Sequence, residues 1–279
     1  MSNRSAINSA GTLPERLRPI EGRHNPLVKQ LRQAFVRGEL TEDGYCAVEG
    51  LRIIEEAIRS GLRFRAMFFS QSAGAKAERL LPQIGANVET RMLPEKLFAS
   101  AVPSETPQGV AALVRLKEAS REDLLEKAKA GPLLAIVGIQ DPGNLGTIFR
   151  SAEAFEAAGV LLGEGTVSPF NSKVVRASAG SIFRLPVLRA RLAESIPELR
   201  KHGLRLIATS SHKGTPLHAA DLSVRLAFFI GGEGAGIRRD LLAKMDEVVA
   251  IPHSPKVESL NAGVAASIVL YEAARQRNS

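Results

Sequence analysis

An α/β fold built on an open parallel sheet is predicted for the second half of this chain, after a smaller α/β domain. Three observations support this fold class. Short apolar runs recur, and some have no polar residue, as strands covered on both faces require. Segments with apolar residues at helical spacing separate them, which is the alternation of a parallel sheet. Hydrophobic residues make up 44% of the 279 residues, enough for a buried core.

Helices and strands alternate through the first half. The first helix is expected over 25–36, "NPLVKQLRQAFV", because its apolar residues recur every three or four positions. The second, "GLRIIEEAIRSG", closes at Gly61, a residue type that often ends helices. Strands are expected at short β-branched or aromatic runs, namely 44–49, 64–70, near Val88, and 108–116.

A longer series of strands fills the second half. It begins at 133–139 with "LLAIVGI", the kind of wholly apolar run that a doubly covered sheet needs. Five further runs follow, with helical segments between them: 159–163, 185–188, 204–210, 226–232 and 247–252.

Composition divides the chain into four parts. These are a polar, flexible tail (1–20), a small α/β domain (21–116), a charged and partly helical linker (117–131) and the larger domain (132–279). The tail lacks the apolar stretch of a secretory signal, and no apolar run approaches the ~20 residues of a membrane span. The single cysteine, Cys46, fits a reducing cytoplasm and is expected to be a small buried residue rather than a nucleophile.

The charge favours a polyanionic partner, nucleic acid first. The formal net charge is +8 and the pI is near 9.9. The segment 171–191 has no acidic residue, and we expect its cations to contact phosphates. These cations are Lys173, Arg176, Arg184, Arg189 and Arg191.

Three motifs lie just beyond the carboxyl ends of predicted strands, where open α/β sheets bind ligands. They are "GIQDPGNLGTIFRSAEAF", "FFIGGEGAGIRRDLL" and "IPHSPKVESLNAGVAASIVLYEAARQR". Singly, each has a structural explanation: Asp141 or Asn144 can cap one helix, and Ser259 or Asn261 another. The glycine-rich turn is neither a P-loop nor a dinucleotide fingerprint, because Ile237 stands where the last glycine should be.

Together and in this order, the motifs resemble those of the SpoU (TrmH-like) RNA ribose methyltransferases of the SPOUT class. The resemblance covers about 133–275 and includes "NSKVVRASAGSIFRLPV" between the first two motifs. Upstream, "RHNPLVKQLRQ", "VEGLRIIEEAI" and "PQGVAALV" resemble the ribosomal-protein-like RNA-binding domain that often precedes the catalytic domain.

The resemblance implies a fold, a cofactor and a reaction. The fold is a parallel α/β sheet whose C-terminal part forms a trefoil knot, and family members are homodimers through this domain. The reaction is methyl transfer from S-adenosylmethionine to a ribose 2'-hydroxyl. By position, the cofactor contacts would be Gly231, Ile251 and Leu260. The catalytic cluster would comprise Arg150, Asn144, Glu233, Ser259 and Asn261.

The chemistry leaves two roles open for Arg150. Guanidinium normally stays charged, so the preferred role is to clamp the phosphate beside the target ribose and orient the hydroxyl. The other role is proton acceptance once RNA is bound. Glu233 is expected to orient Arg150 or Asn144.

The sequence departs from the family at a few positions. Glu156 follows "AF" where the family often has glycine, which concerns a helix end. His253 and Pro255 stand where many relatives carry Met and Gly, which affects the shape near the methyl donor. Two interpretations of His253 stay open: contact with the substrate and, as the preferred one, an exposed loop residue. The other histidines lack partners at ligand spacing, so no metal is expected.

These inferences predict a cytoplasmic RNA 2'-O-ribose methyltransferase that acts on ribosomal RNA, with transfer RNA as the second choice. A nicotinamide-dependent dehydrogenase is disfavoured by the broken glycine fingerprint and the basic charge. A non-catalytic RNA-binding protein on the same fold is disfavoured by the presence of Arg150, Glu233 and Asn261.

Overall fold

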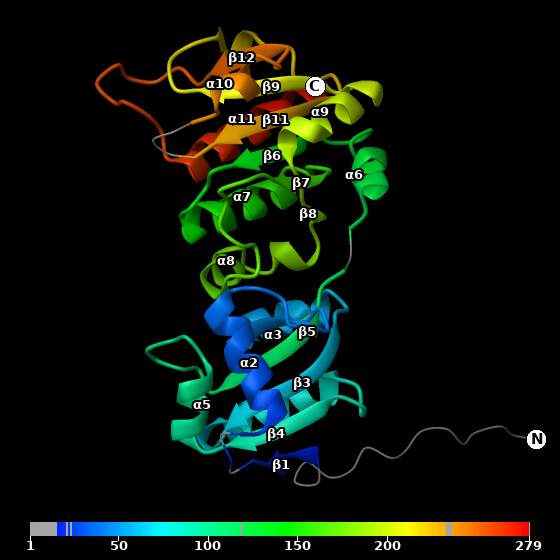
Figure 1. Cartoon of the computed structure of the whole chain (residues 1–279), viewed down its shortest axis with the longest axis vertical. Coiled ribbons are helices and arrows are strands. Elements are labelled where there is room, and N and C mark those ends of the chain that lie inside the picture. Colours follow the sequence, from blue (N-terminus) through cyan, green and yellow to red (C-terminus); the bar gives the residue numbers. More distant parts are fainter. Residues whose placement is uncertain (1–15, 21, 23, 118, 233–235, 279) are drawn as a thin grey trace, which may run out of the picture. The chain divides into compact units, whose positions relative to one another are not determined.

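The two halves of the chain form separate compact units, each around its own sheet (Figure 1). The computed structural model describes residues 16–20, 22, 24–117, 119–232 and 236–278. Within them, the division falls between Leu116 and Lys117. Most of the predicted flexible tail, residues 1–15, lies outside the described residues.

The N-terminal unit is a five-stranded mixed sheet with helices packed on it. The strand order is β1-β4-β3-β5-β2, with β3 parallel to β4 and antiparallel to β5. The strands are β1 (Arg18–Pro19), β2 (Cys46–Glu49), β3 (Arg63–Ser70), β4 (Glu89–Leu93) and β5 (Val110–Arg115). The helices are α2 (Pro26–Arg37), α3 (Leu51–Arg59), α4 (Gly74–Leu80) and α5 (Glu95–Ala101).

Local sequence explains where α2 begins and ends. The Asn25 side chain accepts a hydrogen bond from the Leu27 amide, and Gly38 ends the helix in the left-handed region at φ 61°. Between these caps, Leu31 and Phe35 are buried in one cluster with residues of β3 and α5. Cys46 is also buried, and burial raises the pKa of its thiol to about 12, so the buried cysteine is confirmed.

The C-terminal unit contains the open parallel sheet that the sequence predicts. Every strand pairing in it is parallel, and the order is β10-β12-β9-β11-β6-β7-β8. The strands are β6 (Leu133–Val137), β7 (Gly159–Leu162), β8 (Val187–Arg189), β9 (Arg205–Ser210), β10 (Thr215–Pro216), β11 (Leu226–Gly231) and β12 (Glu247–Ala250). The helices are α6 (Arg121–Lys127), α7 (Pro142–Ala154), α8 (Ser172–Ala177), α9 (Leu192–Lys201), α10 (Arg239–Leu242) and α11 (Ala262–Arg277).

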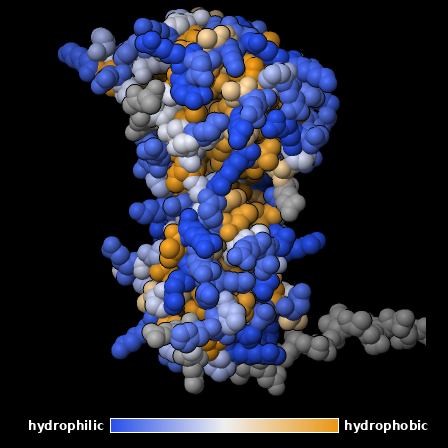
Figure 2. Space-filling view, in the orientation of Figure 1, coloured by the Kyte–Doolittle hydropathy of each residue, from blue (hydrophilic) through white to orange (hydrophobic). Residues whose placement is uncertain are grey.

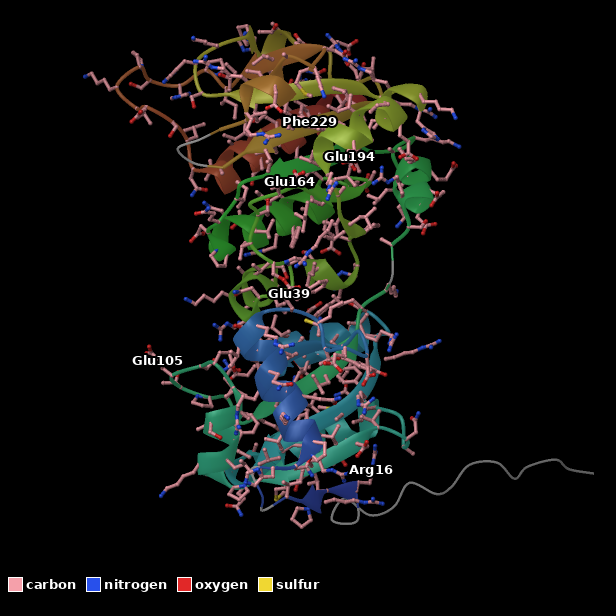
Figure 3. All side chains as sticks on the ribbon, in the orientation of Figure 1. Arg16, Glu39, Glu105, Glu164, Glu194 and Phe229 are labelled. Carbon is pink, nitrogen blue, oxygen red and sulfur yellow. The ribbon has the colours of Figure 1, made fainter. Side chains whose placement is uncertain are left out.

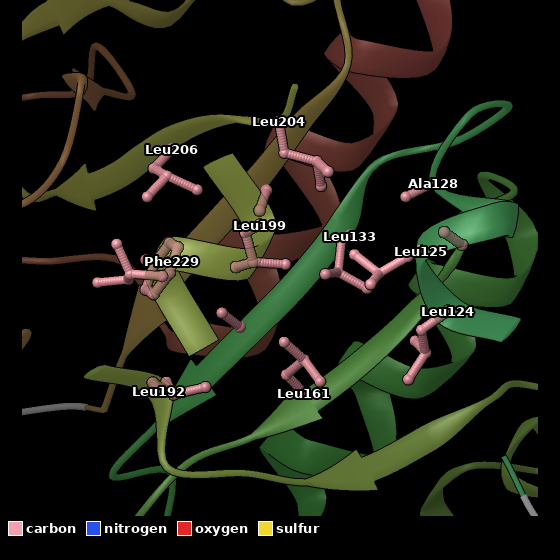
Figure 4. Close-up of a cluster of buried hydrophobic side chains, with 14 of the residues drawn as sticks. Leu124, Leu125, Ala128, Leu133, Leu161, Leu192, Leu199, Leu204, Leu206 and Phe229 are labelled. Atoms are coloured by element: carbon pink, nitrogen blue, oxygen red, sulfur yellow. The ribbon is translucent and has the colours of Figure 1, made fainter. Parts of the chain in front are cut away.

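Both faces of this sheet are covered. Successive side chains of a strand point to opposite faces, so Phe229 and Phe228 of β11 bury against different layers. Phe229 lies in the interior of the unit, in a cluster with leucines of α6 and α9 (Figures 3 and 4). Phe228 is equally buried on the other face, where α11 contacts both β11 and α7. Double coverage accounts for the wholly apolar strand sequences.

The predicted linker contains a helix that belongs to the C-terminal core. Ser120 and Asp123 form a capping box that starts α6. Leu124 and Leu125 of this helix are buried with Leu133 in the core cluster. The segment therefore contributes packing to the C-terminal unit.

The last helix returns across the sheet. β12 pairs with β9, and β9 and β11 stand between it and β6. Yet α11, which follows β12, packs along α7, which follows β6. Ser151 and Ser267 share a hydrogen bond of 2.6 Å between these helices. The segment 251–261 therefore recrosses the carboxyl edge of the sheet, where the predicted motifs lie.

Hydrophilic residues cover most of the face that Figure 2 shows. Among the residues that the structure describes, no helix combines the length and apolar character needed to cross a membrane.

Candidate functional site

A cavity of about 340 Å³ opens at the carboxyl ends of β9, β11 and β12. The segments that follow these three strands form its walls, as expected for a ligand site of an open α/β sheet. Its volume lies in the range of small-molecule sites, roughly 300–1,000 Å³. The lining residues are Thr209, Ser210, Ser211, Ile230, Gly231, Gly232, Gly236, Ile237, Leu242, Ile251, His253, Glu258, Ser259, Leu260, Ala262 and Ala265.

All three residues expected to contact the cofactor line this one cavity. Gly231 ends β11, Ile251 follows β12, and Leu260 precedes α11. Ser259, expected in the catalytic cluster, lines it as well. Gly231 belongs to the second motif, and Ile251, Ser259 and Leu260 belong to the third. Residues at least 20 positions apart in the sequence therefore line one cavity.

Glycine is required where β11 enters this cavity. A Cβ on Gly231 would lie 2.5 Å from the backbone carbon of Gly236 and 2.7 Å from the amide nitrogen of Ile237. A Cβ on Gly232 would lie 2.0 Å from the carbonyl oxygen of Gly138. All three distances are shorter than real Cβ contacts. These glycines therefore allow the backbone segments beside the cavity to pack closely.

Asn144 and Asn261 meet at the starts of α7 and α11. The Asn261 side chain donates through Nδ2 to Oδ1 of Asn144 at 2.8 Å. Oδ1 of Asn261 accepts from the Val264 amide, so this residue is also the N-cap of α11. The Asn144 amide donates to Asp141, the N-cap of α7. The side chain of Asn261 can therefore cap α11 and contact Asn144 at once, because its amide group has both a donor and an acceptor.

Arg150 is exposed on α7 and does not line the cavity. Among the described residues, no hydrogen bond or ion pair is found for its guanidinium group. The structure therefore leaves this cation available to a ligand on the surface of the C-terminal unit. Glu233, its expected partner, lies outside the described residues.

The expectation that His253 is an exposed loop residue is wrong. His253 is half-buried, and its Nε2 atom is buried with no hydrogen-bond partner among the described residues. Its ring packs on that of His212, with the ring centroids 4.9 Å apart. The residue lines the cavity, and its burial was not expected because a pattern of Pro, His and Ser gives no sign of it.

The cations of segment 171–191 are exposed, but several already have partners. Arg184 pairs with Glu153, and its hydrogen bonds lower the pKa of that carboxyl. Arg191 pairs with Glu194 across one helical turn, and Arg189 donates to Ser168 and lies over the Phe170 ring. Exposed ion pairs are worth little, so these cations can still exchange partners with phosphate groups.

The walls of the cavity include residues that the motifs did not single out. Thr209 and Ser210 come from the end of β9, an apolar strand with no motif-like sequence after it. Their position at the carboxyl end of a central strand is the signal that could have identified them. They add hydroxyl groups that can donate or accept hydrogen bonds.

Comparisons with known proteins identify relatives of both units. The pattern of the SpoU rRNA Methylase family matches residues 132–271, and that of the MRM3-like substrate binding domain matches residues 25–112. The 23S rRNA (guanosine(2553)-2'-O)-methyltransferase RlmP of Bacillus subtilis is 33% identical over 255 residues, which cover 91% of this chain and 98% of that protein.

Solved structures resemble the whole chain as well. The SpoU methyltransferase AviRb from Streptomyces viridochromogenes, in complex with the cofactor AdoMet, superposes with a TM-score of 0.80 at 26% identity. That match covers 92% of this chain and 99% of AviRb. The AdoMet-bound rRNA methyltransferase from Sinorhizobium meliloti gives a TM-score of 0.78 at 25% identity, with 93% and 98% covered.

Proposed function

The chain belongs to the SpoU rRNA methylase family, and from this premise we propose that it methylates a ribose 2'-hydroxyl of ribosomal RNA with S-adenosylmethionine. The family resemblance, the α/β fold class and the expected enzyme class are thereby confirmed. Membership also implies that the recrossing segment 251–261 is the threaded part of a trefoil knot.

The arrangement of the site residues is the observation that supports this proposal most directly. The three expected cofactor contacts line one cavity, and the segment that ends with Leu260 continues directly into Asn261, which is bonded to Asn144. The ligand cavity and the polar pair therefore share one short stretch of backbone. A group bound in the cavity would lie next to side chains able to hold an RNA hydroxyl.

The residues present fit S-adenosylmethionine. Gly231 and Gly232 admit close backbone approach, and Ile251 and Leu260 offer apolar contacts for a flat base. Hydroxyl groups of Thr209 and Ser210 suit a ribose or an amino acid group. When bound, the cofactor supplies an electrophilic methyl group on a sulfonium centre.

The other site residues prepare the RNA hydroxyl for attack. Arg150 holds the phosphate beside the target ribose, because its exposed charge can form bidentate hydrogen bonds with phosphate oxygens. Asn144, Asn261 and Ser259 orient the ribose, and Glu233 orients Arg150 or Asn144. Orientation of this kind accounts for large rate effects in transfer reactions. Proton acceptance by Arg150 is the alternative role, and the two are separated by experiment below.

The N-terminal unit is assigned to RNA selection. Its sequence matches a substrate-binding domain over residues 25–112, and the whole chain is strongly basic. Ribosomal RNA is the favoured substrate because the matched relative acts on 23S rRNA. Ribosomal RNA as substrate and a single buried cysteine both support a cytoplasmic location, which we propose for this protein.

Transfer of a radiolabelled methyl group to undermodified ribosomal RNA, transfer RNA and ribosomal particles tests the function. Alkali cannot cleave beside a 2'-O-methylated ribose, so label should appear in an alkali-resistant dinucleotide from ribosomal RNA. Label found only in transfer RNA would show that the substrate is transfer RNA and not ribosomal RNA. Absence of label from every substrate, with the cofactor bound, would favour a non-catalytic RNA-binding protein.

Replacement of Asn261 with alanine should separate capping from catalysis. Loss of the cap should destabilise the C-terminal unit by about 1 kcal/mol. Asn171→Ala removes a similar cap, from α8, and should cost a comparable amount. Only Asn261→Ala should also slow methylation, because only Asn261 bonds to Asn144. Denaturant unfolding and single-turnover rates measure both effects. Equal activity of the two variants would remove Asn261 from the catalytic cluster.

We further propose that two copies associate through α11. Val264 and Tyr271 are 47% and 55% exposed, although both are large and apolar, and they lie seven residues apart on one side of the helix. Ile268 lies between them and is partly exposed. An apolar stripe of this kind on a charged protein fits a second copy of itself.

Tyr271→Asp should convert this dimer to a monomer. A charge in the centre of an apolar interface remains unpaired, which typically costs several kcal/mol. Light scattering after size-exclusion chromatography measures the mass, and Val36→Asp, at an exposed apolar residue of α2, is the matched control. A wild-type mass of one chain would end the proposal, as would a dimer that survives the Tyr271 change.

A further inference from the structure

His253 carries a buried nitrogen without a partner at the wall of the cofactor cavity. Its Nδ1 atom lies 2.7 Å from the carbonyl oxygen of Ile251, and its Nε2 atom has no hydrogen-bond partner among the described residues. His253 lines the cavity together with Ile251 and Leu260, so a small turn of its ring would bring Nε2 to a ligand bound there.

The hydrogen bond of Nδ1 fixes the chemistry of Nε2. A carbonyl oxygen can only accept a hydrogen bond, so Nδ1 carries the proton. In a neutral imidazole the second nitrogen is then an acceptor. Nε2 therefore requires an N–H or O–H group. S-adenosylmethionine offers such groups on the adenine, on the ribose and on the ammonium of its methionine part.

The ring of His253 packs against the ring of His212. The rings of His253 and His212 are inclined by 30° with centroids 4.9 Å apart. His212 follows β9, whose end contributes Thr209 and Ser210 to the cavity. Residues 254–259, after His253, are all exposed, so the segment that carries the ring can shift and turn Nε2 toward a ligand while the ring stays against His212.

We propose that Nε2 of His253 accepts a hydrogen bond from an N–H or O–H group of bound S-adenosylmethionine and so adds to the cofactor affinity of this chain. The inference rests on the proposed function. It gives a role to a histidine that departs from the sequence pattern of the family, since the side chain of methionine is only a weak acceptor.

Calorimetric titration of S-adenosylmethionine into the full chain tests this hydrogen bond. His253→Leu should bind the cofactor roughly tenfold more weakly, the equivalent of one hydrogen bond. His253→Gln should stay near wild type, because its carbonyl oxygen reaches a position similar to Nε2. His212→Phe keeps a ring against His253 and should bind normally. Thermal unfolding establishes that each variant is folded.

Nitrogen NMR of labelled histidine provides a readout independent of affinity. The Nε2 resonance of His253 should move from a free toward a hydrogen-bonded acceptor when the cofactor is added. An unchanged resonance, or a protonated Nε2 in the complex, would overturn the proposal. Equal affinities of His253→Leu and wild type would overturn it too. A wild-type chain that binds no cofactor would instead refute the proposed function.

Cofactor analogues identify the donor. An inosine analogue lacks the adenine amino group, deoxyribose analogues lack one hydroxyl each, and methylthioadenosine lacks the ammonium. Each analogue is titrated into wild type and His253→Leu. The two proteins should bind with equal affinity only the analogue that lacks the donating group. A difference that survives with every analogue would contradict the hydrogen bond.

Discussion

Replacement of Arg150 with alanine is expected to abolish ribose methylation and leave the affinity for S-adenosylmethionine nearly unchanged. Arg150 is exposed on α7 and does not line the cofactor cavity, so its loss removes nothing from cofactor binding. Misplacement of the RNA hydroxyl by about 1 Å costs on the order of a hundredfold in rate, and loss of the phosphate clamp should cost at least that. Single-turnover methylation and calorimetry measure the two quantities.

Arg200→Ala is the matched control. Arg200 is an exposed arginine of the same unit, paired with Asp246 on the surface, and its removal should change neither rate nor cofactor affinity. Full activity of Arg150→Ala would exclude the assigned role. Arg150→Lys separates the two chemical roles: a clamp should retain part of the rate with the wild-type pH profile, whereas a proton acceptor should give a shifted profile.

Gly231→Ala is expected to reduce cofactor affinity by tenfold or more. The new Cβ would lie 2.5 Å from the backbone carbon of Gly236, and backbone cannot yield as a flexible side chain does. The turn must shift, and forced repacking of this kind costs about 1–3 kcal/mol. Because the same turn forms a wall of the cavity, the strain should appear in cofactor binding as well as in stability.

The control for this prediction is Gly74→Ala at the start of α4. No atom lies within 4 Å of a Cβ added there, and its backbone is helical. Calorimetry with S-adenosylmethionine and thermal unfolding should show little change for Gly74→Ala. Normal cofactor affinity in Gly231→Ala would show that the turn after β11 is not part of the cofactor site.

The strands were predictable because burial on both faces leaves a strong sequence signal. Phe228 and Phe229 are adjacent and both buried, so "LAFFIGG" could only be a central strand or a buried helix, and its length favoured the strand. β1 and β10 were not predicted, because two residues carry no periodicity. The core position of Leu124 and Leu125 in α6 was hidden by the charges around them.

The candidate site was predictable only in part. Leu260 and Gly231 follow from motifs whose order is specific, and the structure places both on one cavity. The bond between Asn261 and Asn144 joins residues 117 positions apart, which no local pattern reveals. The contact of His253 with His212 joins two loops 41 positions apart, and such contacts leave no trace in composition.

The return of α11 to α7 has a consequence for synthesis of the protein. Ser267 bonds to Ser151, and 116 residues separate them. At 5–20 residues per second, α7 leaves the ribosome roughly ten seconds before its packing partner exists. The nascent chain therefore exposes an apolar helix face during this interval, a natural substrate for chaperones. Since Leu260 and Ala265 line the cavity, the cavity is complete only when the last helix has been made, and the proposed binding of the methyl donor requires the finished chain.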